Sequence, residues 1–296
     1  MGPEPEIVVV GHIAIDVNVF PWGVIENILG GAPTYGGLAL RALGKEVGAL
    51  SKVGRDLPEK FPPLYRAFGI DTEGIAVVGE HTTLFENIYD KKGRREQKCR
   101  YRAPPLSPED VPEGYREVRG FYVSPVAGEV TPELLRSLKR SDSTVMLDPQ
   151  GLFREVGKGG KVRIRMPGNL QEFVKHADVV KVGREEVEGV KKSPKEMLEL
   201  LKRMGVKIAI VTLGEKGCMA SYEGKTVSVE GLKVQAQDPT GAGDVFGAVF
   251  LAKYLETREV ERSLRFANAA AGLKVRYKGP VGFPSAAEVQ KALGDQ

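Results

Sequence analysis

The sequence has few cysteines and no long apolar segment. It has two cysteines, Cys99 and Cys218, which lie far apart and match no metal-ligand or redox spacing. A disulfide framework is therefore not expected, and both side chains are predicted to be buried. No segment reaches the roughly 18 apolar residues of a membrane-spanning helix. The first residues also lack the basic and apolar regions of a signal peptide. We expect a cytoplasmic protein with no membrane partner.

The sequence also has no block of charge of one sign. Its 43 Lys and Arg residues are interspersed with 39 Asp and Glu residues, which gives a formal net charge of +4. This mild excess suits an anionic small molecule and gives no reason to expect nucleic-acid binding. Hydrophobic residues make up 42% of the 296 residues, a proportion that is ordinary for a globular protein. The length fits one large α/β unit with an appendage.

Short apolar strands alternate with helical segments along most of the chain. The strands expected in a mainly parallel sheet with helices on both faces are 7–10, 47–53, 120–124, 144–148, 177–182 and 207–212. Residues 82–89 and 94–101 form a hairpin pattern with no crossover helix. Together with the strand patterns at 13–20 and 22–29, this hairpin predicts a small antiparallel β lid formed by about residues 13–35 and 78–103. A basic segment at 157–161 is expected to be a solvated connection.

The stretch 238–246, DPTGAGDVF, joins a small-residue turn to an apolar helix. Gly241 and Gly243 permit backbone conformations closed to other residues, and only Ala242 stands between them. Backbone amides at a helix N-terminus favour an anion, such as a phosphate group. Asp244, in the first turn, would face the same space and could take a proton from a hydroxyl. An ordinary glycine-rich loop with a helix-starting Asp fits the spacing equally well.

This stretch resembles the C-terminal signature of the PfkB (ribokinase-like) family of carbohydrate and nucleoside kinases, in which a GAGD turn forms an anion hole and its Asp is the catalytic base. The resemblance implies a catalytic set of Gly241, Ala242, Gly243 and Asp244. It extends over almost the whole length, so it also implies one ribokinase-like kinase domain over residues 1–296.

Further segments match the family's acceptor side. Asp16 corresponds to an Asp that binds sugar hydroxyls in the family, and the GG turn before the next helix is present, whereas Tyr35 stands where family members often carry Asn. The strand residues Asn18 and Asn87 are candidates for which solvent exposure is an equal explanation. The resulting substrate-binding set is Asp16, Asn18, Gly30, Gly31, Asn87 and Gln150, the last in the Asn position of the family's DxN segment.

The donor side rests on the same resemblance. A TxGxxG segment and a helix similar to the family's ANAAAAL helix imply nucleotide contacts from Lys181, Thr212, Gly214, Gly217 and Asn268. Glu186 matches the Glu of the family's NxxE motif, which helps to place Mg²⁺ through water, and Gly183 replaces the motif's Asn. A plain carboxylate in the first turn of a helix is the alternative for Glu186. Mg²⁺ and ATP, or ADP, are the expected cofactor and donor.

These patterns predict a kinase that transfers the terminal phosphoryl group of a Mg-nucleotide to a hydroxyl of a small polyol or sugar. The pattern looks most like the small inositol- and sugar-kinase branch of the family, so myo-inositol is the preferred acceptor. A nucleoside is the rival acceptor, stacked on Phe20, Tyr35, Phe85 or Phe153. A sugar phosphate is a third, given Arg55, Arg100, Arg102 and Arg154. A non-catalytic ligand-binding regulator is the alternative from another class, with Gly183 in its favour. A homodimer through the exposed edge of the lid is also expected.

Overall fold

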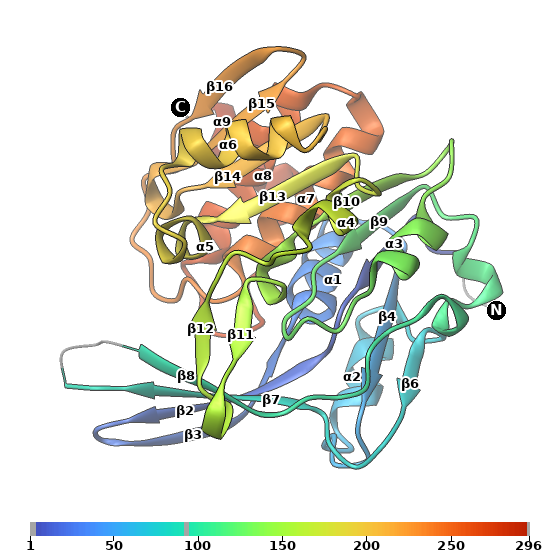
Figure 1. Ribbon diagram of the computed structural model, residues 1–296, viewed down its shortest axis with the longest axis vertical. Coiled ribbons are helices and arrows are strands. Elements are labelled where there is room, and N and C mark those ends of the chain that lie inside the picture. The colour runs from blue at the N-terminus through green and yellow to red at the C-terminus, as the bar shows by residue number, and fades with distance from the viewer. Residues whose placement is uncertain (1–3, 92–94, 295–296) are drawn as a thin grey trace.

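A large, mainly parallel sheet forms the centre of the protein in the computed structural model, which describes residues 4–91 and 95–294 (Figure 1). Across the described part of this main sheet the order is β16-β15-β14-β13-β10-β9-β1-β4-β5, with β6 beside β4, and only the β14–β15 and β15–β16 pairs are antiparallel. Its strands are β1 (Ile7–Val10), β4 (Val47–Val53), β5 (Ile70–Asp71), β6 (Ile75–Val77), β9 (Gly120–Val123), β10 (Thr144–Leu147), β13 (Val179–Gly183), β14 (Ile208–Thr212), β15 (Cys218–Tyr222) and β16 (Lys225–Val229).

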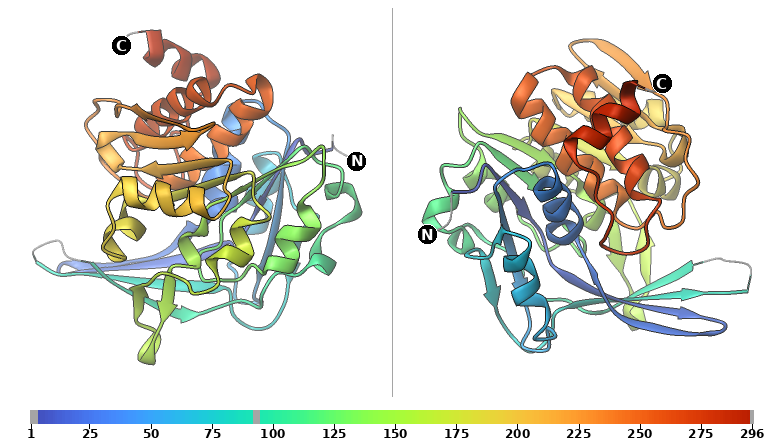
Figure 2. Two further views of the ribbon diagram at one scale, coloured as in Figure 1. Left: turned by 45° about the horizontal axis from the view of Figure 1, so that its top comes forward. Right: turned by 180° about the vertical axis from the view of Figure 1, so that it is seen from behind.

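Helices cover both faces of the main sheet, as Figure 2 shows from behind. They are α1 (Ala32–Ala42), α2 (Phe61–Ala67), α3 (Pro132–Leu138), α4 (Leu170–Val174), α5 (Arg184–Gly189), α6 (Pro194–Arg203), α7 (Ala242–Thr257), α8 (Val260–Lys274) and α9 (Ala286–Gly294). Side chains alternate between the faces of a strand. Ile7 and Val9 of β1 accordingly pack with α1, α7 and α8, whereas Val8 and Val10 pack with α3, α4 and α6. The predicted fold class is confirmed.

A four-stranded second sheet projects from the main body, at the lower left of Figure 1. It consists of β3 (Gly23–Gly30), β2 (Ala14–Phe20), β7 (Thr83–Tyr89) and β8 (Arg95–Tyr101), in that order. The β2–β3 and β7–β8 pairs are antiparallel, as the hairpin patterns predicted. The middle pair, β2 with β7, is parallel, because both strands leave the main body in the same direction.

A second hairpin, β11 (Arg154–Val156) with β12 (Val162–Ile164), lies beside β8, to which it is joined by a bridge between Lys98 and Lys161. The sequence predicted only a solvated connection at 157–161. That segment is indeed the outer turn of the hairpin, but three-residue strands of mixed polarity carry too little periodicity to be recognised. Short 3-10 turns complete the chain at 108–110, 113–115, 149–151, 158–160 and 214–216.

Two smaller expectations concern burial and membranes. Cys99 and Cys218 are both buried free thiols, as predicted. Among the helices of the described ranges, none is long and apolar enough to cross a membrane. Helix α1 begins at Ala32, directly after the GG turn, because Pro33 is compatible with the first turn of a helix.

Candidate active site

Three polar side chains meet where two central strands end and α7 begins. Ser124 directly follows β9, and Gln150 lies in the 3-10 turn after β10. The Oδ1 atom of Asp244 accepts hydrogen bonds from Gln150 Nε2 at 3.0 Å and from Ser124 Oγ at 3.3 Å. Ligands of open α/β sheets bind at the carboxyl ends of the strands, which is where this cluster lies.

The turn before α7 has a conformation that requires glycine. Gly241 is the N-cap of the helix with φ +75°, and a Cβ atom there would lie 2.0 Å from the ring of Tyr35. The amide of Ala242 donates to the Pro239 carbonyl at 3.1 Å. Of the three amides expected to form an anion hole, that of Ala242 thus bonds within the turn itself. A helix N-terminus such as this one favours negative charge.

Asp244 is a weaker acid than an ordinary aspartate. Burial raises its pKa to about 6, and the nearby Asp148 carboxylate adds to this effect. Lys181 and Arg154 act in the opposite direction. A carboxyl group with a pKa near the working pH suits general acid–base chemistry, because it can accept and release a proton.

The ammonium of Lys181 is bound by other groups of the protein. Its side chain is almost fully buried, and its ammonium forms a 2.5 Å ion pair with Asp148 and donates to the Gly243 carbonyl at 3.3 Å. Burial disfavours the charged form, but the Asp148 carboxylate outweighs it and the pKa of Lys181 is raised. The hydroxyl of Tyr122 donates to the same carboxylate. Lys181 was expected to contact the nucleotide. In the structure its ammonium binds the Gly243 carbonyl at the start of α7.

Glu186, Gly183 and Thr212 lie together at the neighbouring ends of β13 and β14. A Cβ atom on Gly183 would be 2.5 Å from Glu186 Oε2 and 3.9 Å from Thr212 Oγ1, so the Glu186 carboxylate occupies the space that glycine leaves open. Burial, assisted by Asp148, raises the pKa of Glu186. In the described ranges no three His, Cys, Asp or Glu side chains form a metal-binding group. One buried carboxylate still fits Mg²⁺, which keeps much of its water and phosphate shell.

A ladder of amides and one carboxylate crosses the second sheet. Asn87 Nδ2 donates to Asp16 Oδ1 at 3.2 Å and to Asn18 Oδ1 at 3.0 Å, and Gln97 Nε2 donates to Asn87 Oδ1 at 2.9 Å. A Cβ atom on Gly30 would lie 2.6 Å from Asp16 Oδ2, so the carboxylate packs against glycine backbone. The structure therefore brings the predicted residues of β2 and β7 together. The sequence analysis did not identify Gln97, although this residue faces Asn87 across the predicted hairpin.

Tyr35 lies between the ladder and the α7 turn. Burial raises its pKa, as do the carboxylates of Asp238, Asp16 and Asp244. Its buried hydroxyl has no hydrogen-bond partner within the described part of the chain. At the preceding helix start Gly31 has φ +87°, and a Cβ atom would lie 2.2 Å from the His12 carbonyl oxygen. The GG turn thus lets α1 begin directly against the backbone of the segment that enters β2.

The remaining predicted nucleotide contacts lie apart from the Asp244 cluster. Gly214 begins the 3-10 turn after β14 and Gly217 directly follows it, with φ +63° and +89°. Asn268 on α8 donates to the Glu230 carbonyl at 2.7 Å. A Cβ atom on Gly217 would lie 2.7 Å from the Glu230 carbonyl carbon, so the turn after β14 and the Asn268 side chain both contact Glu230.

Arg154 is a member of the cluster that the sequence did not assign to it. Its guanidinium donates to Gln150 Oε1 at 3.2 Å and to the Val126 carbonyl at 3.0 Å, and it lies 5.5 Å from the centre of the Phe85 ring. It lowers the pKa of both Asp244 and Glu186 against the effect of burial. Its position at the start of β11 depends on the hairpin, for which the sequence held no clear signal.

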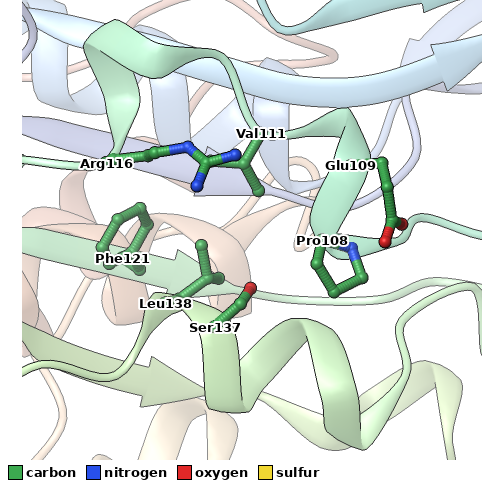
Figure 3. A pocket seen from close by; sticks show the side chains of 7 residues that line it. All are labelled: Pro108, Glu109, Val111, Arg116, Phe121, Ser137 and Leu138. Carbon is green, nitrogen blue, oxygen red and sulfur yellow. The ribbon is translucent and has the colours of Figure 1, made fainter.

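Two hollows are lined by none of these groups. One, of about 280 Å³, includes Val111, Phe121 and Leu138, and Arg116 and Glu109 lie at its edge (Figure 3). Phe121 is near the start of β9, so this hollow is at the end of the sheet opposite Asp244. The other, of about 540 Å³, lies beside the 238–243 turn and is lined by Lys233, Val234, Gln235, Gln237, Arg276 and Tyr277.

Comparison with known proteins agrees with this geometry. The sequence profile of the pfkB family carbohydrate kinases matches residues 4–286. The chain belongs to this family. It is 27% identical over 297 residues to the cytidine kinase of Thermococcus kodakarensis, covering 98% of both chains. It is 30% identical to the inositol 3-kinase of Zea mays, covering 86% of this chain and 68% of that protein. A pyrophosphate-dependent kinase of the ribokinase family, complexed with a pyrophosphate analogue and myo-inositol, superimposes with a TM-score of 0.81 at 25% identity, covering 97% of this chain and 99% of that one.

Membership of the pfkB family makes this chain a phosphotransferase that acts on a hydroxyl group. The relatives are sugar, cyclitol and nucleoside kinases, which leaves the acceptor to be argued from the site.

Proposed function

We propose that this kinase transfers the terminal phosphoryl group of a Mg-nucleotide to a hydroxyl of a small polyol or sugar, with myo-inositol as the preferred acceptor. The observation that carries this proposal is the ladder of Asp16, Asn18, Asn87 and Gln97. Amides donate and accept hydrogen bonds, and a carboxylate accepts two or more. Such a surface is complementary to a ring with several neighbouring hydroxyl groups and no charge.

The Asp244 cluster supplies the chemistry in this proposal. Asp244 takes the proton from the acceptor hydroxyl, while the hydrogen bonds from Gln150 and Ser124 hold its carboxylate in one orientation. The Gly241 and Gly243 amides stabilise the charge on the phosphoryl group during transfer. Because these amides are fixed by the turn, they need no reorganisation during the reaction.

The donor is proposed to lie between the α7 turn and Glu186. The hollow of about 540 Å³ beside residues 238–243 contains Lys233 and Arg276, whose charges suit phosphate groups. Glu186 would hold the Mg²⁺ of the donor through water. ATP and ADP are the first candidates, and pyrophosphate joins them because one structural relative is a pyrophosphate-dependent kinase in complex with myo-inositol.

A nucleoside acceptor is the second candidate, since the cytidine kinase relative covers 98% of this chain. A nucleobase usually needs an aromatic face on which to stack. Tyr35, Phe85 and Phe153 are buried in the core. Phe20 is stacked between Trp22 and Tyr89, at centroid distances of 4.7 and 4.8 Å. The available rings therefore favour a polyol over a base.

A sugar phosphate has less support from the surface arginines. Arg55 is paired with Glu80, and Arg100 with Glu86. Arg102 donates to the Ala127 carbonyl, and only Arg154 lies in the cluster around Asp244. These four arginines thus already have partners in the protein.

A panel of acceptors and donors tests the proposal. Product formation is measured with myo-inositol, fructose, ribose, cytidine, adenosine and fructose 6-phosphate, each with ATP, ADP and pyrophosphate, and with the Asp244→Asn variant as the blank. We expect the highest kcat/KM for a cyclitol or sugar. A higher value for cytidine would replace the polyol with a nucleoside. Tight nucleotide binding without turnover on any acceptor would favour the non-catalytic regulator.

A further inference from the structure

The last residue of α8 is a lysine with no exposure to solvent. The Lys274 ammonium donates to the Tyr277 carbonyl at 3.1 Å and lies 5.6 Å from the centre of the Tyr35 ring and 5.8 Å from that of Phe283. Burial lowers its pKa, and Asp238 opposes this effect. The proposed reaction makes no use of this cation, so its presence in the core needs a reason.

A buried charge is costly to keep. Replacing a buried ionic group by an apolar side chain of similar volume is often neutral or stabilising. A methionine would fill nearly the same space as Lys274 without a desolvation penalty. The packing of α8 therefore does not by itself explain why a cation is retained.

Lys274 lies where the start of the anion-binding turn, the end of α8 and the loop after α8 meet. Asp238 accepts hydrogen bonds from the amides of Thr240 and Gly279, both at 2.9 Å. The amides of Gln237 and Asp238 donate to the Val275 carbonyl, at 2.7 and 3.0 Å. These bonds join the start of the turn to the end of α8 and to the loop that follows it.

The Tyr35 ring lies between the Lys274 ammonium and Gly241. One face of the Tyr35 ring is in reach of the Lys274 ammonium, and the ring is so close to Gly241 that a Cβ atom there would lie 2.0 Å away. A cation at an aromatic face is attracted by the ring quadrupole, more strongly when the cation is desolvated. A shift of the ring would therefore displace the backbone whose amides face the phosphoryl group.

We propose that Lys274 is a positioning residue for the anion-binding turn: its ammonium attracts the Asp238 carboxylate, the Tyr35 ring and the Tyr277 carbonyl, and so fixes the direction of the Gly241 and Gly243 amides. The inference rests on the proposed function, because it needs these amides to contact the transferred phosphoryl group. It assigns Lys274 no contact with either substrate.

Lys274→Met tests the charge separately from the packing. A displacement of about 1 Å in a catalytic group can cost about 10²-fold in rate. We therefore expect kcat to fall about tenfold to a hundredfold, with the KM of the acceptor unchanged and the melting temperature equal to or above that of the wild type. Lys253→Met is the matched control, since Lys253 also lies over a ring, that of Phe266 at 4.9 Å, but in the last turns of α7, where it pairs with Glu256 at 2.8 Å. This control keeps its kcat.

Chemical rescue gives an independent readout. In Lys274→Ala, added ammonium or methylammonium restores part of the lost kcat, whereas tetramethylammonium at the same ionic strength does not, because it is too large for the vacated space. A structural role alone would move the melting temperature and would not respond to the cation. Wild-type kcat in Lys274→Met, or a loss in Lys274→Ala that neither small cation relieves, overturns the proposal.

Failure of the proposed function would be recognised separately. If the wild type turned over no acceptor, calorimetric binding of ATP and of pyrophosphate to the wild type and to Lys274→Met would still test the turn. Weaker binding of both anions by the variant supports the positioning role. Equal binding overturns it.

Discussion

At the scale of single residues, Asp244 carries the most specific expectation. Asp244→Asn keeps the size of the side chain and the hydrogen-bonding reach toward Ser124 but removes the basic oxygen. A positioned base contributes about 10²–10⁴-fold to the rate, so kcat should fall at least about a hundredfold. Nucleotide binding, measured by calorimetry, should remain. Near-wild-type turnover would remove Asp244 from the role of base.

The raised pKa of Asp244 gives a second, pH-dependent expectation. The base must be ionised, so kcat/KM should fall tenfold per pH unit below a pKa of about 6. In the fold this pKa is raised above the ordinary 3.8, so folding favours the neutral carboxyl group. The stability of the fold therefore decreases as the pH rises from 3.8 through about 6, and it stays lower above that pH. Asp244→Asn should therefore be more stable than the wild type at pH 8, by on the order of 1–2 kcal/mol because the side chain is partly exposed, and this advantage should vanish near pH 4. Denaturant unfolding at the two pH values measures the difference. An advantage that is independent of pH would contradict it.

Tyr35 offers a test of the buried hydroxyl. A buried donor without a partner costs about 1–3 kcal/mol, so Tyr35→Phe should raise the free energy of unfolding by about 1 kcal/mol. The ring stays in place against Gly241 and Lys274. Tyr65→Phe is the control, because the Tyr65 hydroxyl is 2.6 Å from Thr34 Oγ1 and its loss should be destabilising. If both variants lose stability to the same extent, the Tyr35 hydroxyl has a partner in solution.

At the scale of elements, the start of α7 depends on one left-handed glycine. Gly241→Ala meets both an unfavourable φ of +75° and the Tyr35 ring. Gly205→Ala is the matched control, since Gly205 has φ +85° at the end of α6 with open space around it. Each should lose about 1–2 kcal/mol from the backbone term. Only Gly241→Ala should also lose kcat, by about 10²-fold or more. A kcat unchanged in Gly241→Ala would show that the turn does not hold the phosphoryl group.

The elements that the sequence predicted are those with strong local signals. The β-branched run of β1 and the apolar helix after Gly243 appear where periodicity and glycine placed them. The parallel pairing of β2 with β7 depends on the path of the chain between them, which no local pattern records. The hairpin that carries Arg154 was missed because its strands, of three residues each, are too short to show a periodicity.

The candidate site, too, has residues with a local sequence signal and contacts that have none. Asp244 and Gly241 were recognisable because a turn at a helix start needs particular residues in a row. The ion pair of Lys181 with Asp148 joins two neighbouring strands. The contact of Lys274 with Tyr35 joins the first and the eighth helices of the described chain. Such contacts between distant segments leave no spacing in the sequence from which they could be predicted.

At the scale of the whole molecule, the two sheets hold different halves of the proposed reaction. At the junction between them, the His12 ring is hydrogen-bonded to the Thr83 hydroxyl and to the Pro104 carbonyl. The Pro104 carbonyl can only accept, so His12 Nε2–H donates to it, and Nδ1 of the neutral ring then accepts from the Thr83 hydroxyl. Burial lowers the pKa of His12 and favours this neutral form, although Glu129 opposes the effect. These bonds join the start of β7 to the segment that enters β2.

The outer edge of the second sheet exposes apolar side chains. β3 is an edge strand, and Trp22, Val24 and Ile25 beside or within it are 73%, 55% and 43% exposed. An exposed apolar edge strand is a template for pairing with another chain, and closed pairing of two identical edges gives a twofold dimer. We expect the protein to be a homodimer through β3.

Sedimentation equilibrium and fluorescence test this dimer together. Trp22 is the only tryptophan of the sequence, so its emission should shift to shorter wavelength as dimers form with rising protein concentration. Val24→Asp should yield a monomer, because it places two like charges opposite each other in a desolvated contact. Val77→Asp, at a residue 64% exposed on β6 of the main sheet, should remain dimeric. A wild type that sediments as a monomer at every concentration, with an emission maximum that does not move, would leave β3 a free edge and place the whole acceptor site within one chain.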